Sequence, residues 1–279
     1  MRIGIMTWLM VAVVVTWSAT FARAAEVVLY TSIDEPYVRP LVQQFQKQTG
    51  IAVKLVTDSE ATKTAGLVEK IEAEKASPKA DVYWGNEPFH TINLSRQGVL
   101  TSYQSPSAAD IPSRWHDKDW LYASIGLRAR MMVYSTRPQY AQLVRSVRGI
   151  QDLTNPALKG RVGLCHPAFG TASGHFAAMY LVLGEARYLE LMRALKANDL
   201  KLLGGNSVVA DQVAAGALVA GITDNDDVAN GKADGQSIDG VLCDQNGMGT
   251  LLIPSAIGLV NGAPHADNGR RLIDFLLTP

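Results

Sequence analysis

The chain has 279 residues, of which 26 are lysine or arginine, 26 are aspartate or glutamate, and 47% are hydrophobic. With two cysteines, this composition is that of a globular protein of one or two domains, and it excludes a disordered chain, a collagen and a disulfide-stapled miniprotein. A net charge of zero removes the simplest argument for a nucleic-acid partner, because phosphate binding relies on a clustered positive excess. We therefore expect no nucleic-acid partner.

The first two dozen residues are expected to form a signal peptide that is removed on export. Arg2 is the charged start, residues 3–15 are almost wholly apolar, and Ala22-Arg23-Ala24 supplies the small residues that signal peptidase needs. The alternative, an uncleaved membrane anchor, is disfavoured by the short apolar core. Removing residues 1–24 leaves 24 basic and 26 acidic residues, so the chain from Ala25 onward has a net charge of −2. We expect the chain from Ala25 onward to be exported.

Export would place Cys165 and Cys243 in an oxidising compartment, where one disulfide could form. Each cysteine ends a short strand-like run, residues 161–165 and 240–243, so both could lie in one sheet. The alternative is two small buried hydrophobic residues. The sequence leaves both open, because it does not give the Cα separation that a disulfide requires.

Strand-like and helical patterns alternate from residue 27 onward, which is typical of parallel sheets covered by helices. Strands are expected at residues 27–30, 52–56 and 81–84, and helices at residues 38–48, at residues 64–76 and before Gly98. Residues 103–120 lack a clear period, and residues 125–134 form a long strand-like run that we interpret as a crossover between two lobes. The chain therefore leaves a first lobe at this point.

The alternation resumes in a second lobe. Strands are expected at residues 161–165, 201–203 and 220–223, and helices at residues 174–183, 186–197 and 207–215. A second crossover at residues 251–260 returns the chain to the first lobe, which a helix at residues 266–277 completes. We expect an α/β fold whose lobes comprise residues 25–125 with 254–279, and residues 126–253. Because the chain ends directly after a helix, we leave open whether the first lobe continues past Pro279.

Acidic residues gather in the loops that follow strands, where open α/β sheets bind their ligands. They are Asp34, Glu35, Asp58, Glu60, Glu87, Asp224, Asp226 and Asp227. Carboxylates in one place repel one another unless they share a cation, so a metal ion or an ammonium-bearing ligand is expected. The alternative for any one acid is a helix N-cap, although adjacent acids such as Asp226 and Asp227 exceed the need of one cap.

Basic and hydroxyl groups complete the expected cleft. The stretch Gly170 to Gly174 opens a helix, and its backbone N–H groups and hydroxyls suit an anion, although a plain glycine turn with a cap is the alternative. Arg128 and Arg130 are two residues apart on a strand and therefore share a face. They could contact a ligand in the cleft, and the alternative is that they pair with nearby acids. A hydrolase using Ser173 and His175 is the rival from another class, but the surrounding residues do not match the nucleophile turn of such enzymes. We therefore expect a binding protein and no enzyme.

The sequence resembles the periplasmic solute-binding proteins of ABC transporters, in particular the branch of ferric-ion-binding proteins. The resemblance rests on residues 28–32, 45–51, 80–84, 152–161 and 254–277. It implies a type II periplasmic-binding-protein fold, with two lobes that close on a ligand by a hinge and deliver it to a permease in the inner membrane. It also implies a monomer without a catalytic cofactor.

In the iron binders a first-loop histidine, a glutamate after the third strand and two adjacent tyrosines hold the metal, with an anion at the glycine-rich loop. Carried over by position, the metal ligands are Asp34, Glu87, Asp226 and Asp227, and the cargo is iron(III) with a companion anion. Because the tyrosines are absent, a small organic solute such as a phosphonate, a sugar phosphate or a polyamine is the alternative. The full expected ligand-binding set is Thr31, Ser32, Asp34, Glu60, Lys63, Asn86, Glu87, Arg128, Thr171, Ala172, Ser173, Asp224, Asp226 and Asp227.

Overall fold

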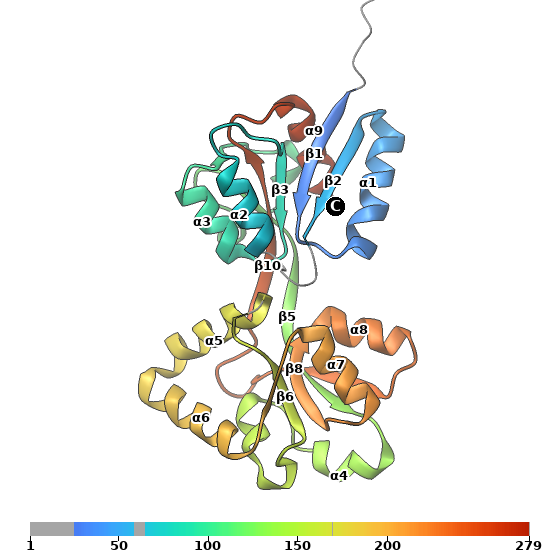
Figure 1. Ribbon diagram of the computed structural model, residues 1–279, viewed down its shortest axis with the longest axis vertical. Coiled ribbons are helices and arrows are strands. Elements are labelled where there is room, and N and C mark those ends of the chain that lie inside the picture. The colour runs from blue at the N-terminus through green and yellow to red at the C-terminus, as the bar shows by residue number, and fades with distance from the viewer. Residues whose placement is uncertain (1–24, 59–64, 169, 279) are drawn as a thin grey trace, which may run out of the picture.

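A computed structural model of the chain describes residues 25–58, 65–168 and 170–278. Two α/β lobes lie one above the other and are joined by β5 (Ala123–Ser135) and β10 (Leu252–Val260) (Figure 1). The strands form one continuous path in the order β2-β1-β3-β10-β5-β8-β6-β7. The expected two-lobed α/β fold is therefore confirmed, while the expected signal peptide lies outside the described residues.

The first lobe is a sheet with helices on both faces. β1 (Glu26–Thr31) pairs in parallel with β2 (Ala52–Thr57) and β3 (Val82–Gly85), and β10 pairs antiparallel with β3 and with the short β4 (Leu100–Thr101). The helices of this lobe are α1 (Glu35–Thr49), α2 (Ala65–Ala73), α3 (Pro88–Arg96) and α9 (Ala266–Leu276).

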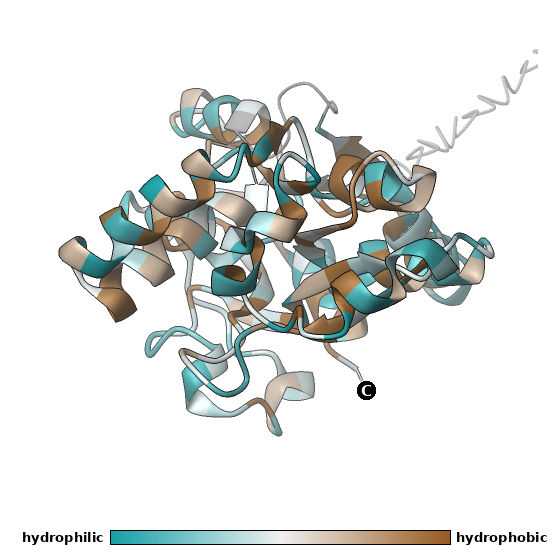
Figure 2. Ribbon diagram, turned by 90° about the horizontal axis from the view of Figure 1, so that it is seen from below, coloured by the Kyte–Doolittle hydropathy of each residue, from teal (hydrophilic) through white to brown (hydrophobic). Residues whose placement is uncertain are grey.

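Strand alternation divides the side chains of the first lobe between two cores. Val27 and Leu29 of β1 pack with α1 and α9, whereas Val28 and Tyr30 pack with α2 and α3. Hydrophilic and hydrophobic residues alternate along the helices (Figure 2), as expected for helices with one buried face. Gly50 ends α1 in the left-handed conformation at φ 70°, which glycine adopts without strain.

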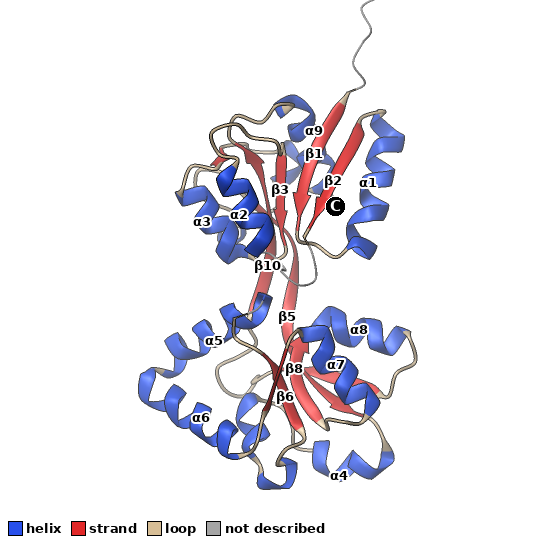
Figure 3. Cartoon of the chain, viewed as in Figure 1, coloured by secondary structure: helices blue, strands red, loops and turns tan. Residues whose placement is uncertain are grey.

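The second lobe repeats this layering (Figure 3). β6 (Val162–Cys165) pairs in parallel with β7 (Lys201–Leu203) and β8 (Ala220–Asp224), and β5 pairs antiparallel with β8 and β9 (Ile238–Leu242). The helices are α4 (Ala141–Val144), α5 (Gly170–Leu183), α6 (Glu185–Ala197), α7 (Asn206–Ala215) and α8 (Asn225–Ala233). Short 3-10 turns η1 (Pro106–Ala108), η2 (Ser113–Trp115), η3 (Pro138–Tyr140), η4 (Ile150–Thr154) and η5 (Pro156–Leu158) fill the connections.

The crossover β5 changes partners in its middle. Residues up to Ala129 pair with β10, whereas residues from Arg130 onward pair with β8 and β9. Arg128 and Arg130 therefore flank the point where the strand passes from one lobe to the other. The exact lobe boundaries expected at residues 125/126 and 253/254 stay a prediction.

Two expectations need correction. The acidic stretch after β8, expected as a loop, is the N-cap and first turn of α8, because carboxylates at a helix start complement the helix dipole. Cys165 and Cys243 are both buried and are not bonded to each other in the structure, so it does not contain the disulfide that the sequence left open. They belong to different core clusters, where each thiol packs as a small hydrophobic residue.

Candidate functional site

The space between the lobes contains two adjoining hollows that both lobes line. The larger, of about 720 Å³, is bordered by Ser32 and Asp58 of the first lobe and by Asp227 and Asn230 of the second. The smaller, of about 270 Å³, is bordered by residues that include Asn86, Arg128 and Asp226. A small-molecule site has a volume of roughly 300–1,000 Å³. The interlobe cleft is therefore large enough for an organic solute.

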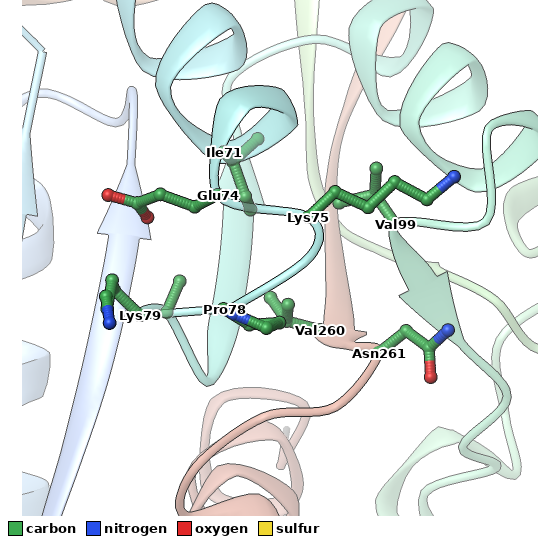
Figure 4. A pocket seen from close by; sticks show the side chains of 9 residues that line it. Ile71, Glu74, Lys75, Pro78, Lys79, Val99, Val260 and Asn261 are labelled. Atoms are coloured by element: carbon green, nitrogen blue, oxygen red, sulfur yellow. The ribbon is translucent and has the colours of Figure 1, made fainter.

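A third hollow lies away from this cleft, in the first lobe between α2 and β10 (Figure 4). Glu74, Lys75, Lys79 and Asn261 border it with several apolar side chains. Its volume is about 10 Å³, which is room for one water molecule. This hollow is too small to hold a transported solute.

Asp224 is the centre of a buried polar cluster where helices of the second lobe begin. Its carboxylate contacts the Arg130 guanidinium at 2.7 Å and accepts hydrogen bonds from the Thr171 hydroxyl at 2.7 Å and the Asn206 amide at 3.2 Å. Thr171 lies in the first turn of α5, Asn206 opens α7, and Asp224 caps α8. The cluster therefore fixes three helix starts relative to β5.

The charge of Asp224 is balanced within the protein. Burial alone would raise the pKa of this carboxyl, but the guanidinium groups of Arg130 and Arg128 outweigh burial and hold the pKa below its ordinary value. Arg130 is 1% exposed and also donates to Thr171 and Asn206. Asp224 is thus ionised and paired before any ligand arrives, so its role is to position the surrounding residues.

Asp226 faces the cleft with an incomplete set of partners. Its Oδ2 lies 3.6 Å from the Arg128 Nη1, whereas its Oδ1 is buried and accepts no hydrogen bond from the described part of the chain. Burial raises its pKa, and the opposing effect of Arg128 does not cancel the rise. A buried carboxylate oxygen without a donor is costly, so this atom is suited to accept a hydrogen bond from a ligand.

Asp227 plays a different part from its neighbour. Its Oδ2 accepts hydrogen bonds from the Thr223 hydroxyl at 2.5 Å and from the Asp224 backbone N–H at 3.2 Å. Asp227, the third residue of α8, thereby forms a capping box with the N-cap residue Asp224. Burial raises its pKa to about 6. Asp227 therefore stabilises the helix start that presents Asp226.

Replacing Asp227 with asparagine should remove a pH dependence of stability. Because the folded-state pKa lies above that of the unfolded chain, the stability from this group is fully present below about pH 4 and declines as the pH rises to about 6. Asparagine keeps the acceptor oxygen without the charge. The free energy of unfolding of Asp227→Asn should therefore exceed that of wild type by on the order of 2 kcal/mol at pH 7 and equal it near pH 4. Urea unfolding across this range measures the difference.

The matched control for this experiment is Asp211→Asn, at an exposed position on α7 of the same lobe. If Asp227→Asn keeps the pH dependence of wild type, or if both variants change it equally, then the buried carboxyl of Asp227 does not cause it.

In the first lobe, Glu87 is buried and engaged with its own helix. Its carboxylate accepts hydrogen bonds from the backbone N–H groups of Phe89 at 2.5 Å and His90 at 3.2 Å, which caps α3. Burial is the largest effect on its pKa and raises it. The neighbouring Asn86 carbonyl accepts a hydrogen bond from Arg128 at 2.7 Å. Of this adjacent pair, Asn86 borders the smaller hollow while Glu87 holds the helix start.

Thr31 and Ser32 fasten the ends of two strands. The Thr31 hydroxyl donates to the Trp84 carbonyl at 2.8 Å, and the Ser32 hydroxyl accepts from the Asn86 backbone N–H at 2.9 Å. Asp34, two residues after Ser32, is the N-cap residue of α1 and borders both hollows. Its charge contributes to the raised pKa of Asp226. The first-loop residues thus lie at the cleft opposite Asp226.

The expected anion loop belongs to α5, which begins at Gly170 rather than at Gly174. Thr171 and Ala172 are buried, and Ser173 is exposed. His175 is buried, and burial lowers its pKa to about 3, so it is neutral. Since Ser173 and His175 are two apart on a helix, they do not face each other, and the geometry disfavours the hydrolase alternative. Glu60 and Lys63 lie outside the described residues.

Three acids of the second lobe are close enough to share a cation. Asp224, Asp226 and Asp227 each offer an oxygen within a group whose atoms lie within 4.8 Å of one another. However, Asp224 is paired with Arg130, and Asp227 serves the capping box. The guanidinium groups of Arg128 and Arg130 already lie beside these acids and would repel a metal cation. Of the three, Asp226 borders the cleft with a carboxylate oxygen that accepts no hydrogen bond from the described part of the chain.

Sequence reasoning missed two asparagines. Asn206 joins the Asp224 cluster, and the Asn225 side chain accepts a hydrogen bond from the Ala129 backbone N–H at 2.7 Å, tying α8 to the crossover strand. Asn206 directly follows Gly204-Gly205 at a helix start, which is a position where asparagine commonly caps. That signal could have identified Asn206. Nothing local marks Asn225 as a contact of a strand 96 residues away.

Comparisons with known proteins agree with this architecture. The model of the family described as "Bacterial extracellular solute-binding protein" matches residues 27–279. Iron uptake protein A1 of Synechocystis sp. is 24% identical over 267 residues, covering 91% of this chain and 71% of that protein. A putative 2-aminoethylphosphonate-binding periplasmic protein of Salmonella typhi is 25% identical over 256 residues, covering 88% and 70%.

The fold has solved counterparts. Iron-bound HitA from Pseudomonas aeruginosa matches with a TM-score of 0.81 and 21% identity, covering 91% of this chain and 81% of that one. At this identity the likeness shows the fold alone. No helix within residues 25–58, 65–168 and 170–278 is both long enough and apolar enough to cross a membrane. Because the family model matches from residue 27 to the last residue, the chain belongs to the bacterial extracellular solute-binding proteins, the substrate-binding components of ABC transporters.

Proposed function

We propose that this protein captures a small organic solute in its interlobe cleft and delivers it to an ABC permease in the inner membrane. Export to the periplasm, a monomeric state and the lack of enzymatic activity are parts of the same proposal. The cleft volume, with hollows of about 720 and 270 Å³ bordered by both lobes, supports a solute larger than a bare ion.

The buried Oδ1 of Asp226 carries this proposal. It lacks a hydrogen-bond donor in the described part of the chain, and it lies in a carboxylate that borders the cleft. A ligand that places an ammonium or hydroxyl group there would satisfy this oxygen and favour its charged form. The same ligand would meet Arg128, whose side chain is 21% exposed, and the exposed Ser173 at the start of α5.

A solute with a donor group at one end and an anion at the other suits these groups best. The amino group of an aminoalkylphosphonate would contact Asp226, and its phosphonate would contact Arg128 and the start of α5. The relative from Salmonella typhi, named as a putative 2-aminoethylphosphonate-binding protein, supports this class. A sugar phosphate would use a hydroxyl at Asp226, whereas a polyamine would leave Arg128 opposed by like charge.

Iron(III) with a companion anion is the second candidate. The grouping of Asp224, Asp226 and Asp227 and the similarity to iron uptake protein A1 favour it. With Asp34 and Glu87, these acids would give a hard, oxygen-rich ligand set. The pairing of Asp224 with Arg130 and the capping roles of Asp227 and Glu87 weigh against it, since each would lose protein contacts on binding the metal.

Ligand-dependent thermal stability tests the two candidates. The chain purified from the periplasm is stripped of ligand and heated with 2-aminoethylphosphonate, a sugar phosphate, spermidine or ferric citrate. A ligand at 100 times its Kd should stabilise the protein by about 2.7 kcal/mol. Stabilisation by an organic solute and not by iron is expected. Stabilisation by ferric citrate alone would contradict the organic cargo and favour the metal, and none at all would contradict both.

A further inference from the structure

Among the described residues, contacts between helices of opposite lobes include two beside the cleft. On one side, the Tyr37 hydroxyl of α1 donates to the Asn230 side-chain oxygen of α8 at 2.9 Å. On the other side, the ring of Phe89 in α3 lies against Gly174 in α5. The ends of α3 and α5, and of α1 and α8, face each other across the gap between the lobes (Figure 1). The contacts therefore flank the cleft.

The packing of Phe89 on Gly174 leaves no space for a side chain. A Cβ placed on Gly174 would lie 2.0 Å from the Phe89 Cε2 and 2.4 Å from its Cζ. Gly174 has no positive φ, so its backbone conformation would accept alanine. The glycine is required here by the approach of the ring from the other lobe, not by the conformation of its own helix.

The Tyr37 contact lies at the rim of the cleft. Tyr37 and Asn230 both border the larger hollow, and Tyr37 remains 43% exposed. Tyr37 belongs to the first lobe and Asn230 to the second, so this hydrogen bond exists only while the lobes are close together. The same holds for the ring of Phe89, which is 41% exposed although it meets α5.

The geometry points to a latch made of Phe89 on Gly174 and Tyr37 on Asn230, which stabilises the closed arrangement of the lobes independently of the cargo. A contact that forms only in one of two states raises the population of that state. Since a solute that contacts both lobes binds the closed state, the latch also raises the apparent affinity in proportion to that population. This inference goes beyond the proposed function, because it holds whichever cargo binds.

The distance between the lobes without any added ligand tests the latch. Spin labels on Gln44→Cys of α1 and Asp211→Cys of α7 occupy exposed positions, one in each lobe, while Cys165 and Cys243 are buried and should stay unlabelled. Pulsed electron paramagnetic resonance then gives the ratio of short to long distances. Tyr37→Phe should lower this ratio by about 2- to 10-fold, which is the usual effect of one hydrogen bond.

Phe89→Ala should lower the ratio by a similar factor, and the variant with both changes should lower it by roughly the product of the two, because the contacts lie on opposite sides of the cleft. Gly174→Ala should lower it as well, although alanine favours the helix. In the Phe89→Ala background, Gly174→Ala should have no further effect, since the ring it displaces is gone.

Matched controls separate the latch from general effects. Gly204→Ala lies in the same lobe with no atom within 4 Å of the added Cβ, and Tyr180→Phe removes an exposed hydroxyl from α5. Both should leave the distances unchanged, and circular dichroism melting checks that every variant is folded. The latch proposal is overturned if Phe89→Ala and the variant with both changes show the same distances as wild type. This outcome does not depend on the result of the ligand screen.

Discussion

Replacing Arg130 with methionine should destabilise the protein by about 3–5 kcal/mol, the usual cost of leaving a buried charge without its partner. Arg130 is 1% exposed and holds Asp224 at 2.7 Å, and Asp224 is itself 1% exposed. The remaining Arg128 contact, at 3.4 Å, is longer and more exposed to solvent. Chemical denaturation of wild type and Arg130→Met measures the loss.

Asp224, the partner of Arg130 in this ion pair, supplies the control for this prediction. In Arg130→Met with Asp224→Asn, the buried negative charge is absent, so the double variant should be more stable than Arg130→Met alone. Arg161→Met, at a partly exposed position in the same lobe, should cost much less. Additive losses from Arg130→Met and Asp224→Asn would contradict the idea that these two side chains act as one pair.

Replacing Asp226 with asparagine should weaken solute binding by about 10- to 100-fold, the range expected when a hydrogen bond to a charged group is lost. The same change should leave the protein without ligand as stable as wild type or more stable, because burial of the carboxylate disfavours its charge. Weaker binding together with unimpaired folding is the distinctive outcome. Titration calorimetry with the ligand found by thermal screening, and urea unfolding, measure the two effects.

Asp234→Asn is the matched control, because Asp234 lies at the end of the same helix and borders the larger hollow. It should change binding far less than Asp226→Asn. Equal losses would indicate a general effect of negative charge in the cleft. A loss of stability in Asp226→Asn without ligand would contradict the view that this carboxyl is kept for the cargo.

The order of strands and helices could be predicted from local pattern because it depends on neighbouring residues. Val38, Val42 and Phe45 recur at helical spacing and are all buried in α1. The run from residue 125 to 134 was long enough to predict a crossover, and β5 spans it. The exception is α8, whose first turn consists of residues typical of a polar loop. Acids that suit a helix start also suit a metal site, so the sequence alone did not separate the two.

The roles of the acids required tertiary structure. The sequence places Asp224, Asp226 and Asp227 together after one strand. In the structure one pairs with Arg130, one completes a helix cap, and one has an oxygen without a donor in the described part of the chain. Pairing of Asp224 with Arg130 joins residues 94 positions apart. This contact forms because β5 and β8 lie side by side in the sheet, and no local sequence pattern reveals that pairing.

The sequence by itself determined the α/β class, the two crossings, the gathering of acids after strands and membership in the solute-binding family, because composition and periodicity reflect burial along each element. Only the tertiary structure decided which carboxylate is neutralised, which serves a helix and which is left for the cargo, and it alone brought Phe89 onto Gly174. The physical reason is that the pKa, partners and exposure of a charged group depend on atoms that are close in space but distant along the chain.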